Sequence, residues 1–291
     1  MNVAIIDIGS NTIRLHIYNI HNKTFESIFT KKIVAGLITY IQDGKLTSRG
    51  IKKIIKILLS HTKLIQLFHI DNFFIFATAV LRNISNADEV LSKVKKETGC
   101  TITILSQDEE AKLGYKGISI FSNYQSGYSI DIGGGSTEIV QFKNKNANIF
   151  LKLNFGCLSL FRSHVHFILP TQDEVVAMTS YINSNLSRNV TMKKLLGIGG
   201  TVRAVGNILS ECLPNNSPTS FLYSDLRYLF DNLIAQDTTI FNLLIQVSPE
   251  RIHTIIPGLI ILKTIMEYYS VESVEVCSTG LREGVLVSKF L

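Results

Sequence analysis

The sequence predicts an α/β protein built from two related halves. Its 291 residues are enough for two compact domains of ordinary size. Short runs rich in Val and Ile alternate with amphipathic stretches, a pattern typical of α/β proteins. A strand, Asp-Ile-Gly, strand pattern also occurs twice, with its aspartates, Asp7 and Asp131, 124 positions apart. Such self-similarity indicates two halves of like fold, with a boundary near residues 120 to 126.

The first half begins with two strands joined by a tight turn. Asp-Ile-Gly-Ser closes the first apolar run, and a second run follows at once, so the turn is a hairpin tip. Helical spacing then alternates with strand-like runs, and Ser85 or Asn86 is suited to cap a helix. The expected strands are Val3–Ile8, Ile13–Tyr18, Phe73–Ala77 and Thr101–Leu105, and the expected helices are Ser48–Phe68, Ser85–Thr98 and Gln107–Gly117.

The second half repeats the hairpin and continues with helices. Tyr128 to Val140 reads as strand, glycine-rich tip and strand, and residues 213–220 read as a polar loop. The remaining strands are expected at Ile149–Leu153, Lys194–Ile198 and Ser273–Cys277, and the helices at Gln172–Asn185, from Thr201 after a Gly199-Gly200 turn, at Arg251–Tyr269 and at Leu281–Leu291.

The composition excludes several classes of protein. No window approaches the roughly 20 uninterrupted apolar residues of a membrane span, and Asp7 interrupts the first apolar run, which a signal peptide would not tolerate. We therefore expect a cytoplasmic protein without a membrane partner. The four cysteines lie far apart without metal-ligand spacing and are expected to be reduced thiols.

The net charge of +6 lies entirely in the first 120 residues, which hold 16 Lys and Arg against 10 Asp and Glu. One interpretation is a solvated lysine-rich face. The other is attraction of an anionic substrate, nucleic acid included. Charge alone does not decide between them.

The two hairpin tips and a third glycine-rich turn predict phosphate binding. Glycine allows backbone N–H groups to approach a phosphate closely, and a helix N-terminus after Gly199-Gly200 favours an anion. The alternative is a set of tight turns that only pack two sheets. The expected phosphate-binding residues are Gly9, Ser10, Asn11, Gly133, Gly134, Gly135, Ser136, Thr137, Gly199, Gly200 and Thr201.

Seven sequence blocks resemble the exopolyphosphatase / guanosine pentaphosphate phosphatase (Ppx/GppA) family of the actin-like ATPase superfamily. They are Ile6–Arg14, Ala77–Asn83, Leu105–Lys112, Asp131–Glu138, Asn154–Cys157, Gly197–Arg203 and Gly280–Gly284. The resemblance implies two ribonuclease-H-like domains, 1–122 and 123–280, with a cleft between them, and a C-terminal segment 281–291 that packs back on the first. It also implies Mg²⁺ and hydrolysis of a terminal phosphoanhydride.

The same resemblance implies roles for individual residues. Glu110 matches the glutamate that activates or positions the attacking water, although an acid at this place could also only complement the helix dipole. Asp131 and Glu138 match acidic residues near the metal, and Asp7 stands at the equivalent turn of the first half. Arg82, Arg14 and Arg282 are candidates to neutralise phosphate charge, with Arg82 the strongest, or to pair with nearby acids. We therefore expect Glu110, Asp131 and Arg82 to be catalytic.

Two positions depart from the family pattern, and one of them is Thr279 before Gly280, where a larger residue is common. Ser159 stands where a basic residue is common, so one anion contact is expected to be missing. The leading hypothesis is an exopolyphosphatase acting on inorganic polyphosphate, and the alternative is release of the 5′ terminal phosphate from guanosine pentaphosphate. A small-molecule kinase and a non-catalytic binder of polyphosphate or an alarmone are less well matched. Nucleic acid is not expected as a partner, and a homodimer stays open.

Overall fold

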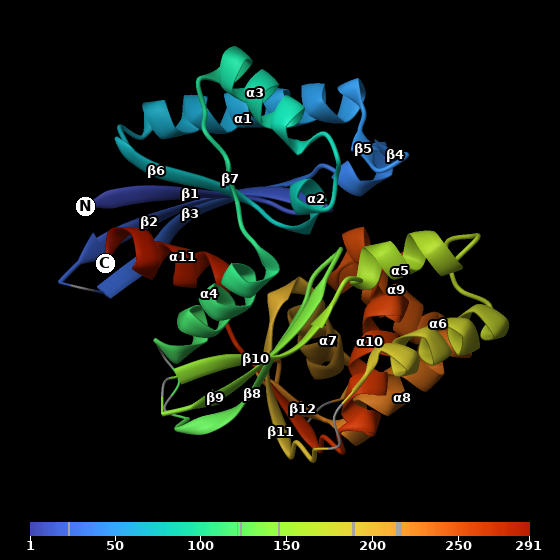
Figure 1. Cartoon of the computed structure of the whole chain (residues 1–291). Coiled ribbons are helices and arrows are strands. Elements are labelled where there is room, and N and C mark those ends of the chain that lie inside the picture. The colour runs from blue at the N-terminus through green and yellow to red at the C-terminus, as the bar shows by residue number, and fades with distance from the viewer. Residues whose placement is uncertain (23, 121, 123, 145, 188–189, 214–216) are drawn as a thin grey trace. The chain divides into compact units, whose positions relative to one another are not determined.

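The computed structural model describes residues 1–291 except 23, 121, 123, 145, 188–189 and 214–216. The chain divides into two compact units (Figure 1). Unit 1 comprises Met1–Glu110 and Val285–Leu291, and unit 2 comprises Ala111–Gly284. The boundary predicted between residues 122 and 123 is later in the chain, beside positions that lie outside the described residues. Part of the predicted polar loop 213–220 lies outside them as well.

Unit 1 is built on a five-stranded mixed sheet with the order β3-β2-β1-β6-β7. Its first three strands form an antiparallel meander, and β6 and β7 join it in parallel. The third strand of the meander, β3, was not predicted. The strands are β1 (Asn2–Ile8), β2 (Thr12–His21), β3 (Thr24–Val34), β6 (Asn72–Ala77) and β7 (Thr103–Ile104), with a small hairpin of β4 (Ile41–Gln42) and β5 (Lys45–Leu46) beside them.

Helices cover one face of this sheet (Figure 1). Ala4, Ile6 and Ile8 of β1 are fully buried against the apolar side of α1 and α3. Because side chains alternate along a strand, Asp7 lies on the opposite face from these helices. The elements are the 3₁₀ helix η1 (Leu37–Tyr40), α1 (Ser48–Leu67), α2 (Ala79–Arg82) and α3 (Ala87–Thr98).

The predicted cap of α3 is confirmed in its position, Asn86, but not in its side-chain hydrogen bond. Asn86 occupies the N-cap position of α3 but makes no cap bond with its side chain. Its amide instead spans to β5, where Oδ1 accepts from the Leu46 N–H at 2.9 Å and Nδ2 donates to the Leu46 carbonyl at 3.1 Å. Ser85 Oγ donates to the Gly44 carbonyl at 3.2 Å. Both side chains therefore hold the β4–β5 hairpin, a tertiary contact that a local cap signal does not reveal.

The end of the chain belongs to unit 1. Helix α11 (Leu281–Phe290) contributes residues from Val285 onward, and Val285 and Leu286 are buried. The Lys289 ammonium lies 4.9 Å from the centre of the Phe74 ring on β6. The segment predicted to return to the first half thus joins it from Val285, while its first turn belongs to unit 2.

Unit 2 repeats the same sheet plan with one more strand, in the order β10-β9-β8-β11-β13-β12. Again the first three strands form a meander, and β11 joins β8 in parallel. The strands are β8 (Ser126–Ile132), β9 (Thr137–Lys143), β10 (Asn146–Leu153), β11 (Lys194–Ile198), β12 (Ser220–Leu222) and β13 (Ser273–Val276).

The larger core of unit 2 is centred on α10, whose side chains are almost all buried. The predicted helix at this place begins later than expected, because residues Pro249–Arg251 form a separate 3₁₀ helix, η2. The helices on this side are α5 (Cys157–His164), α6 (Gln172–Asn185), α7 (Gly199–Cys212), α8 (Tyr223–Ile234), α9 (Thr238–Val247) and α10 (Ile255–Tyr268). Of these, α5, α8 and α9 were not predicted.

Helix α4 (Gln107–Ser119) covers the other face of the unit 2 sheet. Ala111, Tyr115 and Ile118 form a small core with residues of β9 and β11, and the Tyr115 and Phe142 rings stack at 4.8 Å. This packing explains why most of α4, predicted in the first domain, is counted with unit 2. None of the described helices combines the length and the apolar character that crossing a membrane requires.

Two glycines allow α11 to approach α4 closely. A Cβ at Gly284 would overlap the Leu113 carbonyl oxygen, and a Cβ at Gly117 would overlap the Gly280 carbonyl oxygen. Any larger residue would therefore have to push the two backbones apart. The Gly280–Gly284 block is thus explained in part by helix packing.

Candidate functional site

The first predicted phosphate loop is the tip of the β1–β2 hairpin. The Gly9 N–H donates to the Thr12 carbonyl at 2.9 Å and closes the turn. The Ser10 carbonyl accepts from Ile38 N–H at 3.1 Å, and the Asn11 carbonyl accepts from the N–H groups of Ala35 and Gly36 at 2.8 Å. The carbonyl groups of the tip are therefore held by the chain that follows β3.

The second predicted loop, at the β8–β9 tip, is built in the same way. The Gly133 N–H donates to the Ser136 carbonyl at 3.0 Å. The carbonyls of Gly133 and Gly134 accept from the first turn of α5, through the N–H groups of Cys157 at 3.0 Å, Leu158 at 3.0 Å and Ser159 at 2.9 Å. The α5 N-terminus thus fixes this loop.

The repeat predicted from the sequence extends to individual hydrogen bonds. At an offset of 124 residues, Gly9 matches Gly133 and Thr12 matches Ser136, and the same turn bond joins each pair. Within the described part of the chain, the N–H groups of Ser10, Asn11, Gly134 and Gly135 donate to no backbone carbonyl. Consecutive backbone N–H groups of this kind form anion-binding concavities. Each unit therefore presents one such pair of donors at its hairpin tip.

Glu110 and Arg82 form an ion pair in unit 1. Arg82 Nη1 donates to Glu110 Oε2 at 2.7 Å and to the Leu105 carbonyl at 3.0 Å. The two side chains are only 10% and 16% exposed for Glu110 and Arg82, respectively. Helix α2 begins after β6, and α4 begins after β7, so neighbouring parallel strands deliver both groups to one sheet edge. The two residues that the sequence singled out for chemistry are thus brought together.

The neighbouring Glu109 stabilises the start of α4. Its Oε2 accepts from the N–H and the hydroxyl of Ser106, both at 2.8 Å, and its own N–H donates to Ser106 Oγ at 3.2 Å. This reciprocal pair is a capping box at the start of α4. The hydrogen bonds from Ser106 hold the pKa of the Glu109 carboxyl below its usual value. The helix-terminus role considered for the acidic run therefore belongs to Glu109, and Glu110 faces Arg82.

The predicted metal ligands fall into two groups. Asp131 and Glu138 are register partners on β8 and β9, so their side chains lie side by side on one sheet face. Asp7 in unit 1 is the register partner of Arg14 instead, so the position that corresponds to Glu138 carries the opposite charge. Among the described residues no group of three or more His, Cys, Asp or Glu side chains could hold a metal ion. Two neighbouring carboxylates nevertheless suit Mg²⁺, which commonly takes one or two together with waters and substrate oxygens.

The third glycine-rich turn places the start of α7 against Asp131. Gly199 has φ +86°, a conformation that L side chains rarely adopt, and a Cβ there would overlap Asp131 Oδ1. Gly199 and Gly200 form the first turn of α7, where N–H groups have no partner within the helix. A glycine is therefore required for the helix N-terminus to lie beside this carboxylate.

Two predicted donors are used inside the protein. Thr137 is fully buried and its hydroxyl donates to the Phe155 carbonyl at 2.9 Å. Thr201 is 2% exposed and its hydroxyl donates to Cys157 Sγ at 3.7 Å. These hydroxyl groups donate to acceptors within unit 2, so phosphate binding by Thr137 and Thr201 stays a prediction for their backbone N–H groups. Ser159 stands where a basic residue is common in the family. Its Oγ accepts from the Gly156 N–H at 2.8 Å and so caps α5.

Unit 2 also gathers arginines beside Asp131, one of which the sequence analysis gave no role. Arg203 lies on α7, and burial lowers the pKa of its guanidinium, with a further decrease from Arg282 and an opposing effect of Asp131 and Glu283. Arg203 Nη1 donates to the Cys277 carbonyl at 3.5 Å. Arg203 lies four residues after Gly199, within a glycine-rich block, and this position could have identified it as a site residue.

The remaining residues of the Gly280–Gly284 block are structural apart from Arg282. Glu283 is 8% exposed, and its Oε2 accepts from the Gly280 N–H at 2.8 Å, which closes the first turn of α11. Gly280 and Gly284 serve the packing against α4 described above. Arg282 is the member of the block that adds positive charge close to Arg203.

The family model that matches this sequence covers residues 16–291 and describes the Ppx/GppA phosphatase family. The chain belongs to the Ppx/GppA phosphatase family. The sequence-based assignment is therefore confirmed, and the protein is an enzyme of the phosphatase class.

Individual relatives and solved structures of the Ppx/GppA family agree. The chain is 25% identical to Exopolyphosphatase 1 of Mycobacterium tuberculosis over 304 residues, which covers 99% of this chain and 88% of the relative. It is 26% identical to a guanosine-5'-triphosphate,3'-diphosphate pyrophosphatase of Pseudoalteromonas atlantica, covering 97% of this chain and 57% of the relative. The crystal structure of the Aquifex aeolicus Ppx/GppA family member superposes with a TM-score of 0.82 at 27% identity and covers 99% of this chain and 97% of its own. The predicted actin-like α/β fold is thus confirmed.

Proposed function

We propose that this Ppx/GppA protein is an exopolyphosphatase, which hydrolyses the terminal phosphoanhydride of inorganic polyphosphate and releases phosphate. The observation that carries the proposal is the pair of equivalent hairpin tips, each with two consecutive N–H groups available to an anion. Backbone donors recognise phosphate oxygens and need no base or sugar. The relative named Exopolyphosphatase 1, aligned over nearly the whole chain, supports this substrate class.

The chain's own residues divide the work of the reaction. The tip N–H groups of Ser10, Asn11, Gly134 and Gly135 bind phosphate oxygens. Arg82 adds positive charge where negative charge accumulates during phosphoryl transfer. Glu110, held by Arg82 at 2.7 Å, orients the attacking water and takes its proton.

Asp131 and Glu138 would hold the Mg²⁺ ion that the family resemblance implies. When bound, the ion supplies positive charge to phosphate oxygens. Asp131 is kept in place by the start of α7, because Gly199 leaves room for its carboxylate. Location in the cytoplasm and a homodimeric state remain predictions from the sequence.

A second candidate is hydrolysis of guanosine pentaphosphate, favoured by the similarity to the Pseudoalteromonas pyrophosphatase. Both activities would use the same hairpin N–H groups and the same water. We place polyphosphate first because the described donors recognise phosphate alone.

The test is phosphate release from long polyphosphate, tripolyphosphate, guanosine pentaphosphate and ATP, each at equal phosphate concentration with Mg²⁺. We expect the highest kcat/KM with polyphosphate and no transfer to added alcohols. A preference for guanosine pentaphosphate would support the second candidate, and phosphorylation of an added sugar would refute both.

A further inference from the structure

Helix α1 carries an arrangement of charge that costs folding stability. Its 20 residues include five Lys or Arg and no Asp or Glu. Arg49 lies in the first turn, where the positive end of the helix dipole disfavours cations. Lys52 and Lys56 are also like charges four residues apart, which repel. Covering the sheet does not require this arrangement, whereas binding of an anion along the helix would use it.

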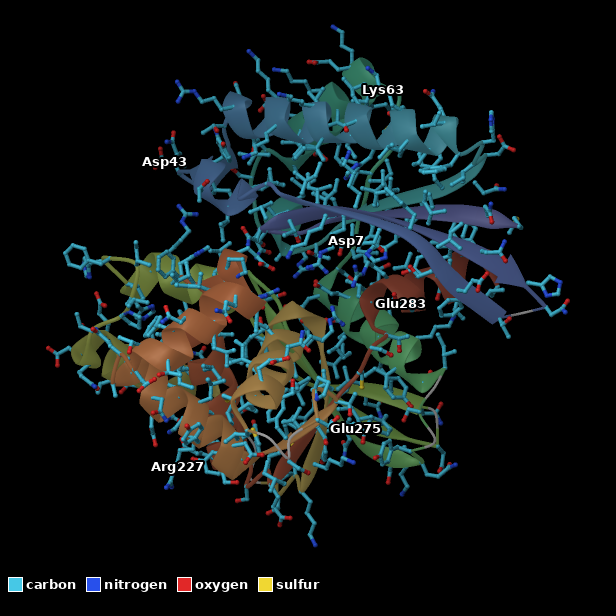
Figure 2. All side chains as sticks on the ribbon, turned by 180° about the vertical axis from the view of Figure 1, so that it is seen from behind. Asp7, Asp43, Lys63, Arg227, Glu275 and Glu283 are labelled. Atoms are coloured by element: carbon cyan, nitrogen blue, oxygen red, sulfur yellow. The ribbon has the colours of Figure 1, made fainter. Side chains whose placement is uncertain are left out.

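The lysines line a groove rather than a flat surface. Lys52, Lys56 and Lys63 follow one stripe of α1 and border a hollow of about 540 Å³ that reaches Glu97 on α3. Three exposed cations thus face one exposed acid. Figure 2 shows Lys63 on the outer side of α1. From Lys52 to Lys63 the helix rises about 16 Å, which is long enough for several neighbouring charges of a linear polyanion.

Within unit 1, the start of α1 lies beside η1, the segment that holds the first hairpin tip. The Ser10 carbonyl accepts from Ile38 of η1, and the last residue of η1, Tyr40, accepts at its carbonyl from the Thr47 N–H at 2.9 Å. The Tyr40 ring lies 5.2 Å from the Lys53 ammonium. A second hollow of about 410 Å³ at the start of α1 is bordered by Arg49. Two further cations, Arg49 and Lys53, therefore lie at the end of α1 that is beside η1.

We propose that the α1 groove, defined by Lys52, Lys56 and Lys63, is a second binding site for linear inorganic polyphosphate, which captures long chains outside the phosphate-binding tips. The proposal rests on the proposed function for the identity of the substrate. It concerns a different surface, because Asp7 and Arg14 lie on the sheet face opposite α1.

The lining of the groove favours polyphosphate over nucleic acid. Single-stranded nucleic acids bind where aromatic side chains stack on the bases. The residues described along the groove are Lys52, Ile55, Lys56, Leu59, Ser60, Lys63 and Glu97, which offer charge and aliphatic surface. Lysine ammonium groups bind phosphate as point charges without a required geometry, which suits a polymer that can slide.

The experiment compares the triple variant K52Q/K56Q/K63Q with K93Q/K95Q/K96Q. The control removes the same charge from α3 of the same unit, at lysines that do not border the groove. Binding of long-chain polyphosphate is measured in the presence of a chelator, so that no turnover is needed, and KM is measured separately for long chains and for tripolyphosphate. Three exposed ion contacts of ordinary strength predict that the groove variant binds long chains about tenfold more weakly.

The expected result is a rise in the KM for long chains in the groove variant alone, with the KM for tripolyphosphate unchanged. The difference from wild type should shrink with salt, since exposed charges are screened over about 8 Å at physiological ionic strength. Equal weakening by both variants would overturn the proposal, because total charge would then be the cause. Tighter binding of an oligonucleotide or of anionic vesicles than of polyphosphate at equal charge would overturn the choice of ligand. If the wild type releases no phosphate from polyphosphate, the proposed function fails, and the chelator binding assay still decides whether the groove binds the polymer.

Discussion

Replacing Glu110 with glutamine keeps the size of the side chain and removes its charge and its ability to accept a proton. If Glu110 acts as the general base, kcat should fall by roughly 10²- to 10⁴-fold. The structure also predicts a loss of stability, because Glu110 Oε2 accepts from Arg82 Nη1 at 2.7 Å and both side chains are largely buried. Leaving the guanidinium without its charged partner should cost roughly 1–3 kcal/mol.

Glu109→Gln is the matched control, since it removes the same charge one residue away. Glu109 caps α4 through Ser106, so its loss should cost about 0.5–1 kcal/mol of stability and leave kcat close to wild type. Both variants are compared by initial rates of phosphate release at saturating polyphosphate and by urea unfolding at pH 7. Rates are measured well below the unfolding midpoint, so that stability and catalysis are separated. Equal rates for the two variants, or an inactive Glu109→Gln protein, would show that Glu110 is not the base.

Three further predictions concern single positions. Gly199→Ala should reduce kcat by more than the loss of folded protein accounts for, because a Cβ at φ +86° would displace the Asp131 carboxylate. Phosphate release measures kcat, and circular dichroism measures the folded fraction. Gly284→Ala should lower the free energy of unfolding by about 1–3 kcal/mol, because its Cβ would overlap the Leu113 carbonyl, as measured by urea unfolding. His61 is fully buried, and desolvation, followed by the charge of Lys31, lowers its pKa to about 4. The stability that depends on neutral His61 is present above about pH 6.5 and is lost as the pH falls towards 4, by up to about 3 kcal/mol, and His61→Leu should remove this dependence.

Each of these predictions has an outcome that contradicts it. Full activity of Gly199→Ala would mean that Asp131 needs no fixed position. An unchanged unfolding midpoint for Gly284→Ala would show that α4 and α11 can separate without cost. A wild-type protein whose acid sensitivity survives in His61→Leu would place the responsible group elsewhere.

The two related halves could be predicted from the sequence because the repeated hairpin has a local sequence pattern. Each Asp-Ile-Gly turn follows a β-branched run, and the spacing between Asp7 and Asp131 gave the offset that the turn hydrogen bonds reproduce. The boundary could not be predicted in the same way. The boundary depends on which hydrophobic core Ala111, Tyr115 and Ile118 pack into, and tertiary contacts decide this. Strand β3 was missed because its lysines and partly exposed side chains mask the alternation of an edge strand.

In the candidate site, too, local signals identified single residues, whereas their tertiary contacts could not be predicted. The sequence blocks identified Glu110 and Arg82 individually, but their ion pair joins residues 28 positions apart and has no local signature. Thr137 and Thr201 carried a reasonable donor signal, yet their hydroxyl groups are consumed by Phe155 and Cys157. Residue type predicts which groups can bind phosphate, whereas only packing decides which of them are left to do so.

The two hairpin tips offer their donors from the main chain, so side-chain substitution is a poor probe of them. Ser10 and Asn11 in one tip correspond to Gly134 and Gly135 in the other, although the chemical nature of the side chains differs. Alanine at Ser10 or Asn11 would keep the N–H groups of this tip in place, so an alanine scan would not reveal their contribution. Only changes that remove an N–H or rotate a peptide plane, such as proline or a backbone ester, would expose their contribution.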